Sequence, residues 1–376
     1  LTLFLPYRLL SHGARLDERW AVLIFGFGGF LWSLALLRYL CKKYFSGASG
    51  RSVAFAGWIL GFANYIPMLL RPHCVYEVAV SSGFFFLAGS LYFLSSAFAA
   101  EKPSYKKIAW GSLFLGLAAG SRPHFLILSF LLLAVTLFRL SPKDPAKKDY
   151  FRSLGALLAP FLAFFCFWMS YNYLRFENVF EAGAAYIPMN PGNYLFHPLL
   201  AVPNSYFFLF RPPRLDSYFP YLHLQNEFPD FMRFAHSWYR VIENSVGLLP
   251  SVPFAGLLLV SPYAFRNAAK NSTINLRDLL SDFALILFPA AIGLPIFLCF
   301  WSVCNRYFAD FASFLILSAT VVWLTVDACL TNNSGTRNKF RFLVIFLGLI
   351  SIFSGIIYAV DFRGYNLDHF YLWARS

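Results

Sequence analysis

The sequence predicts an all-α polytopic membrane protein, a single transmembrane domain over residues 1–376 with about ten transmembrane helices. Apolar residues make up 59% of the chain and charged residues only 13%, and the mean hydropathy is +0.58. These values lie far outside the range of soluble domains. The apolar runs lack the period-two alternation of an outer-membrane barrel, so helices are the expected way across the membrane.

Ten apolar stretches reach or approach the roughly 20 residues that a helix needs to cross the hydrocarbon layer. They cover residues 20–40, 52–70, 77–99, 107–121, 124–140, 153–174, 246–265, 279–301, 307–327 and 341–360. Only Ser121, Arg122 and Pro123 separate the fourth stretch from the fifth. We expect a tight outer hairpin there, because one fused helix would reverse the orientation of everything downstream.

Lysines and histidines occupy alternate breaks between these stretches. The ten lysines are Lys42, Lys43, Lys102, Lys106, Lys107, Lys143, Lys147, Lys148, Lys270 and Lys339. The seven histidines are His12, His73, His124, His197, His223, His236 and His369. Because short cationic loops stay in the cytoplasm, the lysine-bearing segments are expected inside and the histidine-bearing segments outside. The pattern predicts a multi-pass protein of the cytoplasmic (inner) membrane with an extracytoplasmic active face.

The net charge of +13 does not indicate nucleic-acid binding, because the cations are dispersed between apolar runs and form no continuous basic patch. Every cation in the predicted outer segments is an arginine. A guanidinium offers a planar fork that fits phosphate oxygens, whereas an ammonium is a point charge. We expect membrane lipids as partners, with these arginines acting either as anchors at helix ends or as ligands for a lipid phosphate.

Residues 175–245 form the longest break, and we expect an extracytoplasmic loop with interfacial helices. Residues 206–221 hold seven aromatic side chains and two arginines, and residues 227–245 are typical of an amphipathic helix in the interface. Loops of this length are usually functional. The loop is therefore expected to cap an outward-facing cavity, with a purely structural lid as the alternative. Residues 1–19 would also lie outside, so a first helix and most of a first outer loop are expected upstream of Leu1.

Two outer turns carry candidate groups for chemistry. Arg71 and His73 precede Glu77, the only acid of the turn between the second and third stretches. Glu77 opens a helix, where the helix dipole stabilises a carboxylate, so it is either a structural cap or a catalytic group that positions or deprotonates an acceptor. Arg122 and His124 lie at the hairpin tip, where a guanidinium and freed helix amides would bind an anion. A simple interfacial turn is the alternative.

Two further outer segments carry the remaining candidate substrate-binding residues. Arg306 and Tyr307 begin the ninth stretch, and Arg306 is expected either to pair with Asp310 one helical turn later or to bind a phosphate. Arg175 and Glu181 lie where the sixth stretch leaves the membrane. Anchoring in the aromatic belt would by itself explain the tyrosines around them.

Three motifs resemble those of a known superfamily. They are the GSRP hairpin at 120–123, the YNYLRFENVFEAG segment at 171–183 and the RYFADF segment at 306–311. Together they are similar to bacterial integral-membrane glycosyltransferases of the GT-C superfamily, which are related to protein O-mannosyltransferases. The resemblance covers most of the chain and implies a GT-C-like fold.

The resemblance also implies a reaction. A sugar would pass from a polyprenyl-phosphate donor to a lipid, glycan or protein acceptor at the outer face of the membrane. Arginines such as Arg122 and Arg306 would neutralise the leaving phosphate. The principal catalytic acid of the superfamily would then lie upstream of Leu1. We expect no cofactor beyond the donor, which is a co-substrate, and no metal, because the six cysteines are scattered singly and no nucleotide fingerprint is present.

Two alternatives come from other functional classes. A transporter or flippase of a lipid-linked or anionic substrate would also be polytopic and arginine-bearing, but it would be expected to have internal repeats and broken helices. A non-catalytic membrane scaffold of the same fold is the other alternative.

Overall fold

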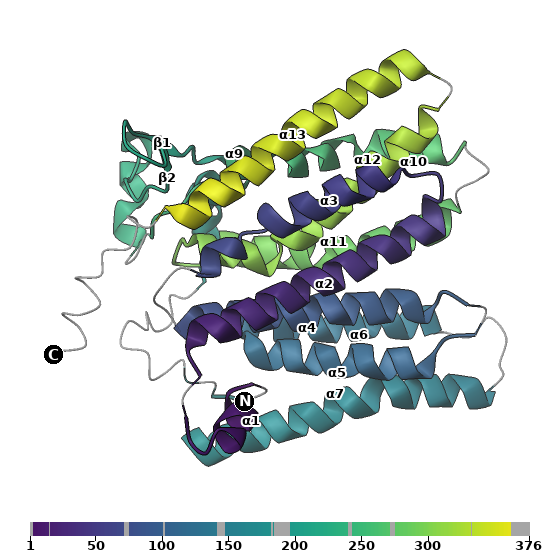
Figure 1. Ribbon diagram of the computed structural model, residues 1–376. Coiled ribbons are helices and arrows are strands. Elements are labelled where there is room, and N and C mark those ends of the chain that lie inside the picture. The colour runs from purple at the N-terminus through teal and green to yellow at the C-terminus, as the bar shows by residue number, and fades with distance from the viewer. Residues whose placement is uncertain are drawn as a thin grey trace.

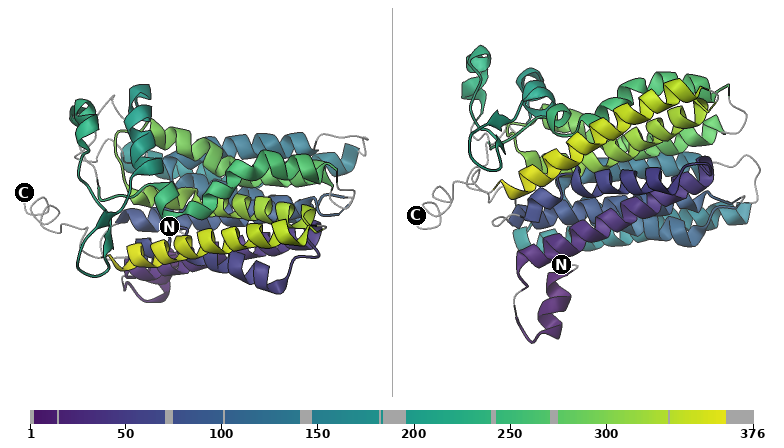
Figure 2. Two further views of the ribbon diagram at one scale, coloured as in Figure 1. Left: turned by 90° about the horizontal axis from the view of Figure 1, so that it is seen from above. Right: turned by 45° about the horizontal axis from the view of Figure 1, so that its top comes forward.

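The computed structural model describes residues 3–14, 16–70, 75–100, 102–140, 147–181, 183, 196–239, 243–270, 275–331 and 333–361. Its long helices run side by side in one bundle, and an irregular segment over residues 196–239 and 243–245, called the outer segment after its predicted side, gathers at one end (Figure 1). Figure 2 shows the same arrangement from above and from an oblique angle, with α1 (Phe4–Leu10) at that same end.

Seven helices within the described ranges are long and apolar enough to cross a membrane. They are α2 (Glu18–Tyr44), α4 (Val75–Ala97), α6 (Pro123–Leu140), α7 (Lys147–Phe176), α11 (Leu276–Leu298), α12 (Ala312–Cys329) and α13 (Ser334–Val360). The prediction of an all-α polytopic membrane protein is confirmed. The tight hairpin is also present, because α5 (Tyr105–Ser121) ends directly before α6 begins.

Three of the ten predicted stretches form shorter elements. The fourth stretch is α5, a 17-residue helix. The second divides into α3 (Gly50–Phe62) and the 3₁₀ helix η1 (Pro67–Leu70), and Tyr65 between them has a positive φ of 63°. The seventh divides into α9 (Leu248–Ser251), the 3₁₀ helix η7 (Pro253–Val260) and α10 (Ser261–Ala268). Proline lacks an N–H and disfavours a helical residue before it, which explains breaks at these points.

The two ends of the bundle differ as the lysine and histidine pattern predicts. Figure 1 shows α2, α4, α6, α10 and α12 ending at the right-hand end of the bundle, whereas α5 and α7 end at the left-hand end, the one at which the outer segment gathers. Lys42 and Lys43 close α2, and Lys270 follows α10. His124 begins α6 at the opposite end. Which end faces the cytoplasm stays a prediction.

The bundle has a buried centre and an exposed edge. α12 is buried along most of its length, whereas α7 exposes most of its apolar surface. α4 packs between α2 and α5, and α5 packs in turn against α7. In a membrane the exposed apolar side chains of α7 and α13 meet lipid, so they need no protein partner.

Asp282 ties three helices together near the lysine-bearing end. Asp282 is 2% exposed. Its Oδ2 lies 3.0 Å from Lys43 Nζ and accepts a 2.7 Å hydrogen bond from the Tyr44 hydroxyl. Its Oδ1 accepts a 2.9 Å hydrogen bond from Arg139. These partners end α2 and α6, and Asp282 lies in the second turn of α11. The contact therefore joins α2, α6 and α11 at one depth.

Gly355 marks the closest approach of α13 to α3. A Cβ added at Gly355 would overlap the carbonyl oxygen of Phe62 and lie 2.8 Å from its carbonyl carbon. The Phe62 backbone cannot rotate out of the way as a side chain could. Gly355→Ala is therefore expected to lower the free energy of unfolding by about 1–3 kcal/mol. Thermal unfolding in detergent measures the effect. Gly155→Ala on α7 is the matched control, because nothing lies within 4 Å of its added Cβ; equal unfolding midpoints for the two variants would contradict this packing.

The outer segment contains short elements. They are the 3₁₀ helix η4 (Pro198–Leu200), α8 (Ala201–Ser205), the π-helical turn η5 (Tyr206–Phe210), β1 (Arg214–Leu215), β2 (Leu222–His223) and the 3₁₀ helix η6 (Asp230–Trp238). The 3₁₀ helix η8 (Asn305–Asp310) is separate from this segment and leads into α12. β1 and β2 form a two-stranded antiparallel pair. Among the described residues of the helix predicted over 227–245, the nine-residue η6 is helical, with Phe231, Phe234 and Trp238 exposed along it. Pro229 precedes its first residue.

Candidate functional site

A cluster of charged side chains lies under the outer segment, centred on η8. Arg306 and Asp310 both belong to η8 but do not pair with each other; that pairing was one of the two alternatives expected for Arg306. A 3₁₀ helix has three residues per turn, so residues four apart point in different directions. Arg306 therefore turns toward α4 and the outer segment, and Asp310 turns toward the α5–α6 hairpin.

Asp310 receives the hairpin residues. Its Oδ2 accepts a 2.8 Å hydrogen bond from Arg122 Nη2 and lies 3.4 Å from His124 Nε2. The Asp310 side chain is 1% exposed and that of Arg122 is 11% exposed. Asp310 Oδ1 is buried and has no hydrogen-bond partner among the described residues. Leaving a buried hydrogen-bond acceptor without a donor costs free energy, and a ligand or a water molecule often supplies that donor.

The backbone before Pro123 aims Arg122 at this site. Arg122 has extended angles of φ −144° and ψ 130°, as expected for a residue that precedes proline. Its guanidinium lies 5.6 Å from the centre of the Tyr307 ring, and that ring stacks on Phe297 at 4.8 Å. Burial raises the pKa of Tyr307 to about 12, so the phenol is neutral at physiological pH.

Arg306 forms the second half of the cluster. Its Nη2 donates a hydrogen bond to Glu243 Oε1, and its Nη1 lies 3.7 Å from Glu77 Oε1. The Cys304 thiol donates a 2.7 Å hydrogen bond to Glu243 Oε2. The guanidinium also lies 5.2 Å from the centre of the Tyr76 ring. Glu77 Oε2 is buried without a hydrogen-bond partner among the described residues.

Opposing effects act on the charges around Arg306. Burial acts to lower the pKa of Arg306, but the carboxylates around it, Glu243 and Glu77, hold that pKa well above its ordinary value. Burial also raises the pKa of the Cys304 thiol well above its ordinary value. The thiol therefore keeps its proton and serves as a donor to Glu243.

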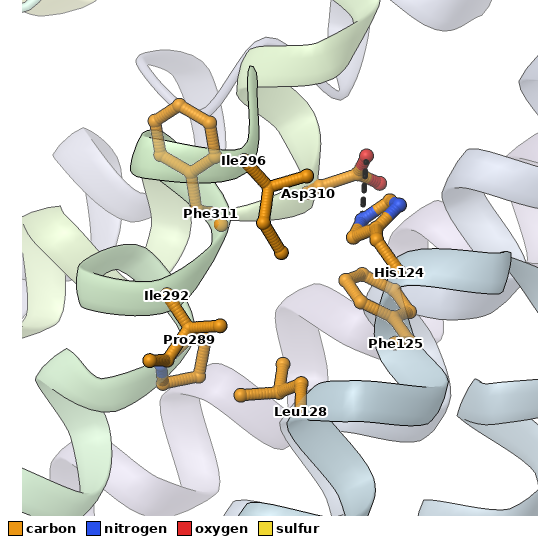
Figure 3. A pocket seen from close by; sticks show the side chains of 9 residues that line it. His124, Phe125, Leu128, Pro289, Ile292, Ile296, Asp310 and Phe311 are labelled. Atoms are coloured by element: carbon orange, nitrogen blue, oxygen red, sulfur yellow. Dashed lines mark ion pairs between the residues drawn. The ribbon is translucent and has the colours of Figure 1, made fainter. Parts of the chain in front are cut away.

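A narrow apolar crevice ends at Asp310 and His124 (Figure 3). One wall comes from α6 and the other from the C-terminal half of α11, and Phe311 also contributes to the lining. Its lining residues are His124, Phe125, Leu128, Pro289, Ile292, Gly293, Ile296, Asp310 and Phe311. His124 and Asp310, whose Nε2 and Oδ2 lie 3.4 Å apart, stand at one end of a lining that is otherwise hydrocarbon, as Figure 3 shows. The crevice thus joins a polar end to an apolar length, and its walls lie too close together to admit a water molecule.

The structure brings together five of the predicted site residues and adds two. Glu77, Arg122, His124 and Arg306 meet around η8, with Tyr307 beside them. Asp310 and Glu243 complete the cluster. Sequence reasoning treated Asp310 only as a partner for Arg306 and did not select Glu243. Glu243 lies 63 residues from Arg306 along the chain, and no local pattern indicates that contact.

The other predicted residues lie elsewhere. Arg175 ends α7, where its guanidinium lies 4.6 Å from the centre of the Phe176 ring and 5.3 Å from that of Tyr171. Glu181 accepts a 2.6 Å hydrogen bond from the backbone N–H of Gly183. These contacts are local and indicate anchoring at the end of α7. Arg71 and His73 lie outside the described residues.

Both arginines of the cluster already have anionic partners in the structure, and phosphate binding by them stays a prediction. Arg122 and Arg306 face three carboxylates, those of Asp310, Glu243 and Glu77. A phosphate must therefore share or replace a carboxylate at either guanidinium. Comparison with known proteins does not place the chain in a family: no protein-family model, no curated protein and no solved structure matches it.

Proposed function

We propose that the protein is a membrane glycosyltransferase that moves a sugar from a polyprenyl-phosphate donor to a lipid, glycan or protein acceptor at the outer membrane face. The observation that carries this proposal is the buried Arg122–Asp310–His124 group at the polar end of an apolar crevice. A polyprenyl phosphate has the same two-part chemistry, a long hydrocarbon tail and an anionic head. The apolar walls of the crevice suit the tail once α6 and α11 separate to admit it, and the guanidinium suits the head.

The cluster contains the groups that the reaction needs. An acceptor hydroxyl attacks the anomeric carbon, the bond from that carbon to the phosphate oxygen breaks, and its electron pair leaves with the phosphate. Arg122 and Arg306 stabilise the leaving charge. A carboxylate oxygen takes the hydroxyl proton. Asp310 Oδ1 and Glu77 Oε2 are the candidates, because both are buried without a hydrogen-bond partner among the described residues.

Donor turnover in proteoliposomes tests the proposal. The protein, with any sequence that flanks residues 1–376, is incubated with radiolabelled polyprenyl-phosphate sugars, and release of polyprenyl phosphate is measured. Arg122→Gln and Arg306→Gln are each expected to lower turnover about 100- to 1,000-fold, as removal of one charge-stabilising donor does. Arg175→Gln is the matched control, because its described contacts are local. Unchanged turnover in both test variants would exclude the proposed role of these arginines.

A flippase is the second candidate, and one observation favours it. Two of the predicted membrane stretches are broken: one divides into α3 and η1, and the other divides into α9, η7 and α10. Broken helices within the membrane are a feature of transporters. The two functions differ in their products. A flippase moves the intact lipid-linked sugar between leaflets, whereas the transferase releases polyprenyl phosphate. Leaflet exchange of the donor without loss of its sugar would favour the flippase.

A further inference from the structure

Arg306 already has a carboxylate partner that comes from the outer segment. Glu243 contributes Oε1 to Arg306 Nη2 and Oε2 to the Cys304 thiol, and its backbone N–H donates a 3.0 Å hydrogen bond to the carbonyl oxygen of Val303. These contacts tie the end of the outer segment to the chain that leads into η8. A phosphate that binds Arg306 must compete with this contact.

Among the carboxylates of the cluster, Glu243 is the one that can leave. Its side chain is 28% exposed, against 8% for Glu77 and 1% for Asp310. Glu77 lies in the first turn of α4 and Asp310 in η8, whereas Glu243 lies in an irregular stretch. A released Glu243 carboxylate therefore reaches water with a small movement. The other two would remain buried.

Exchange of partners is favoured over simple release. The Arg306 side chain is 12% exposed, and a buried guanidinium without an anion is strongly unfavourable. A phosphate monoester or diester offers the same bidentate geometry as a carboxylate and can carry more charge. The guanidinium would thus remain neutralised throughout the exchange.

We propose that Glu243 occupies Arg306 until the phosphate of a polyprenyl-phosphate ligand displaces it, so that ligand binding releases the Glu243 side chain from Arg306 and Cys304 while the backbone contacts to Val303 and Asn305 remain. This inference rests on the proposed function, because it takes the ligand to be a lipid phosphate at the same cluster. Glu243 is therefore a gating carboxylate. The displacement exposes the site to an acceptor arriving from the outer face.

Binding of farnesyl phosphate to the protein in nanodiscs tests the competition. Glu243→Gln is expected to bind farnesyl phosphate about tenfold more tightly than the wild type, because the neutral amide competes less for the guanidinium. Glu227→Gln is the matched control, since Glu227 lies in the same outer segment and pairs with exposed Arg214. Its affinity is expected to equal that of the wild type. Equal or weaker binding by Glu243→Gln would overturn the inference.

A thiol-labelling experiment needs no change at Glu243. In a variant whose only cysteine is Cys304, which is 3% exposed, farnesyl phosphate is expected to increase the rate of maleimide labelling at least severalfold. Inorganic phosphate at the same concentration is expected to leave the rate unchanged, since it has no tail for the crevice. An unchanged rate with farnesyl phosphate, or equal acceleration by inorganic phosphate, would contradict displacement by a lipid phosphate.

The two proposals fail in different ways. If the wild type binds farnesyl phosphate and Arg306→Gln abolishes that binding, but neither Glu243→Gln nor thiol labelling shows a change, the lipid-phosphate site stands and the gating role of Glu243 is wrong. If the wild type does not bind farnesyl phosphate, both proposals are wrong.

Discussion

Asp310→Asn is expected to lower donor turnover about 100- to 10,000-fold, the range that a positioned general base contributes. The carboxylate ends the apolar crevice, holds Arg122 at 2.8 Å, and keeps Oδ1 without a partner among the described residues. An asparagine has nearly the same shape but cannot accept the acceptor proton. Steady-state release of polyprenyl phosphate in proteoliposomes measures the effect.

Loss of structure must be separated from loss of chemistry at this position. Asp310→Asn leaves Arg122 buried without its carboxylate, which also destabilises the fold. The double variant Arg122→Gln/Asp310→Asn removes both charges, so its unfolding midpoint is expected to recover toward the wild type while turnover stays low. Asp230→Asn on exposed η6 is the matched control. Wild-type turnover in the folded double variant would show that neither residue takes part in the reaction.

Asp282→Asn is expected to cause the largest loss of stability, about 3–5 kcal/mol, because one carboxylate neutralises two cations in a buried setting. Lys43 and Arg139 would lose their anion, and the contact that joins α2, α6 and α11 would weaken. Thermal unfolding of the detergent-solubilised protein measures the change. Asp278→Asn, four residues earlier on the exposed surface of α11, is the control. Similar midpoints for the two variants would mean that Asp282 does not hold these helices together.

Apolar runs predict most of this fold because a membrane imposes one simple condition, an uninterrupted hydrocarbon surface about 20 residues long. The helices α2, α11 and α13 follow directly from that condition. Breaks within apolar sequence were not predicted. Tyr65 adopts a left-handed conformation before η1, and three separate prolines, at positions 250, 253 and 262, divide residues 246–265. A hydropathy average over a membrane-length stretch hardly changes at such residues. It therefore cannot locate breaks that local backbone geometry sets.

The site was predictable in its residue types and not in its pairings. Arginine and histidine at a hairpin tip indicated an anion site, and Arg122 and His124 do lie in the cluster. Their partner Asp310 is 188 residues from Arg122 along the chain. The prediction that Arg306 pairs with Asp310 assumed an α-helix, whereas η8 is a 3₁₀ helix. Tertiary packing and helix type decided the contacts, and neither can be read from spacing.

Photo-crosslinking tests most directly the central claim, that a polyprenyl phosphate binds with its head at Arg122 and its tail in the crevice. A donor with a diazirine in the isoprenoid unit next to the phosphate is irradiated with the protein in nanodiscs, and the labelled peptides are sequenced. We expect label on residues 124–128 of α6 and 292–296 of α11, and we expect excess unlabelled donor to suppress it. Label spread over the lipid-facing surfaces of α7 and α13, with no competition by donor, would contradict the account.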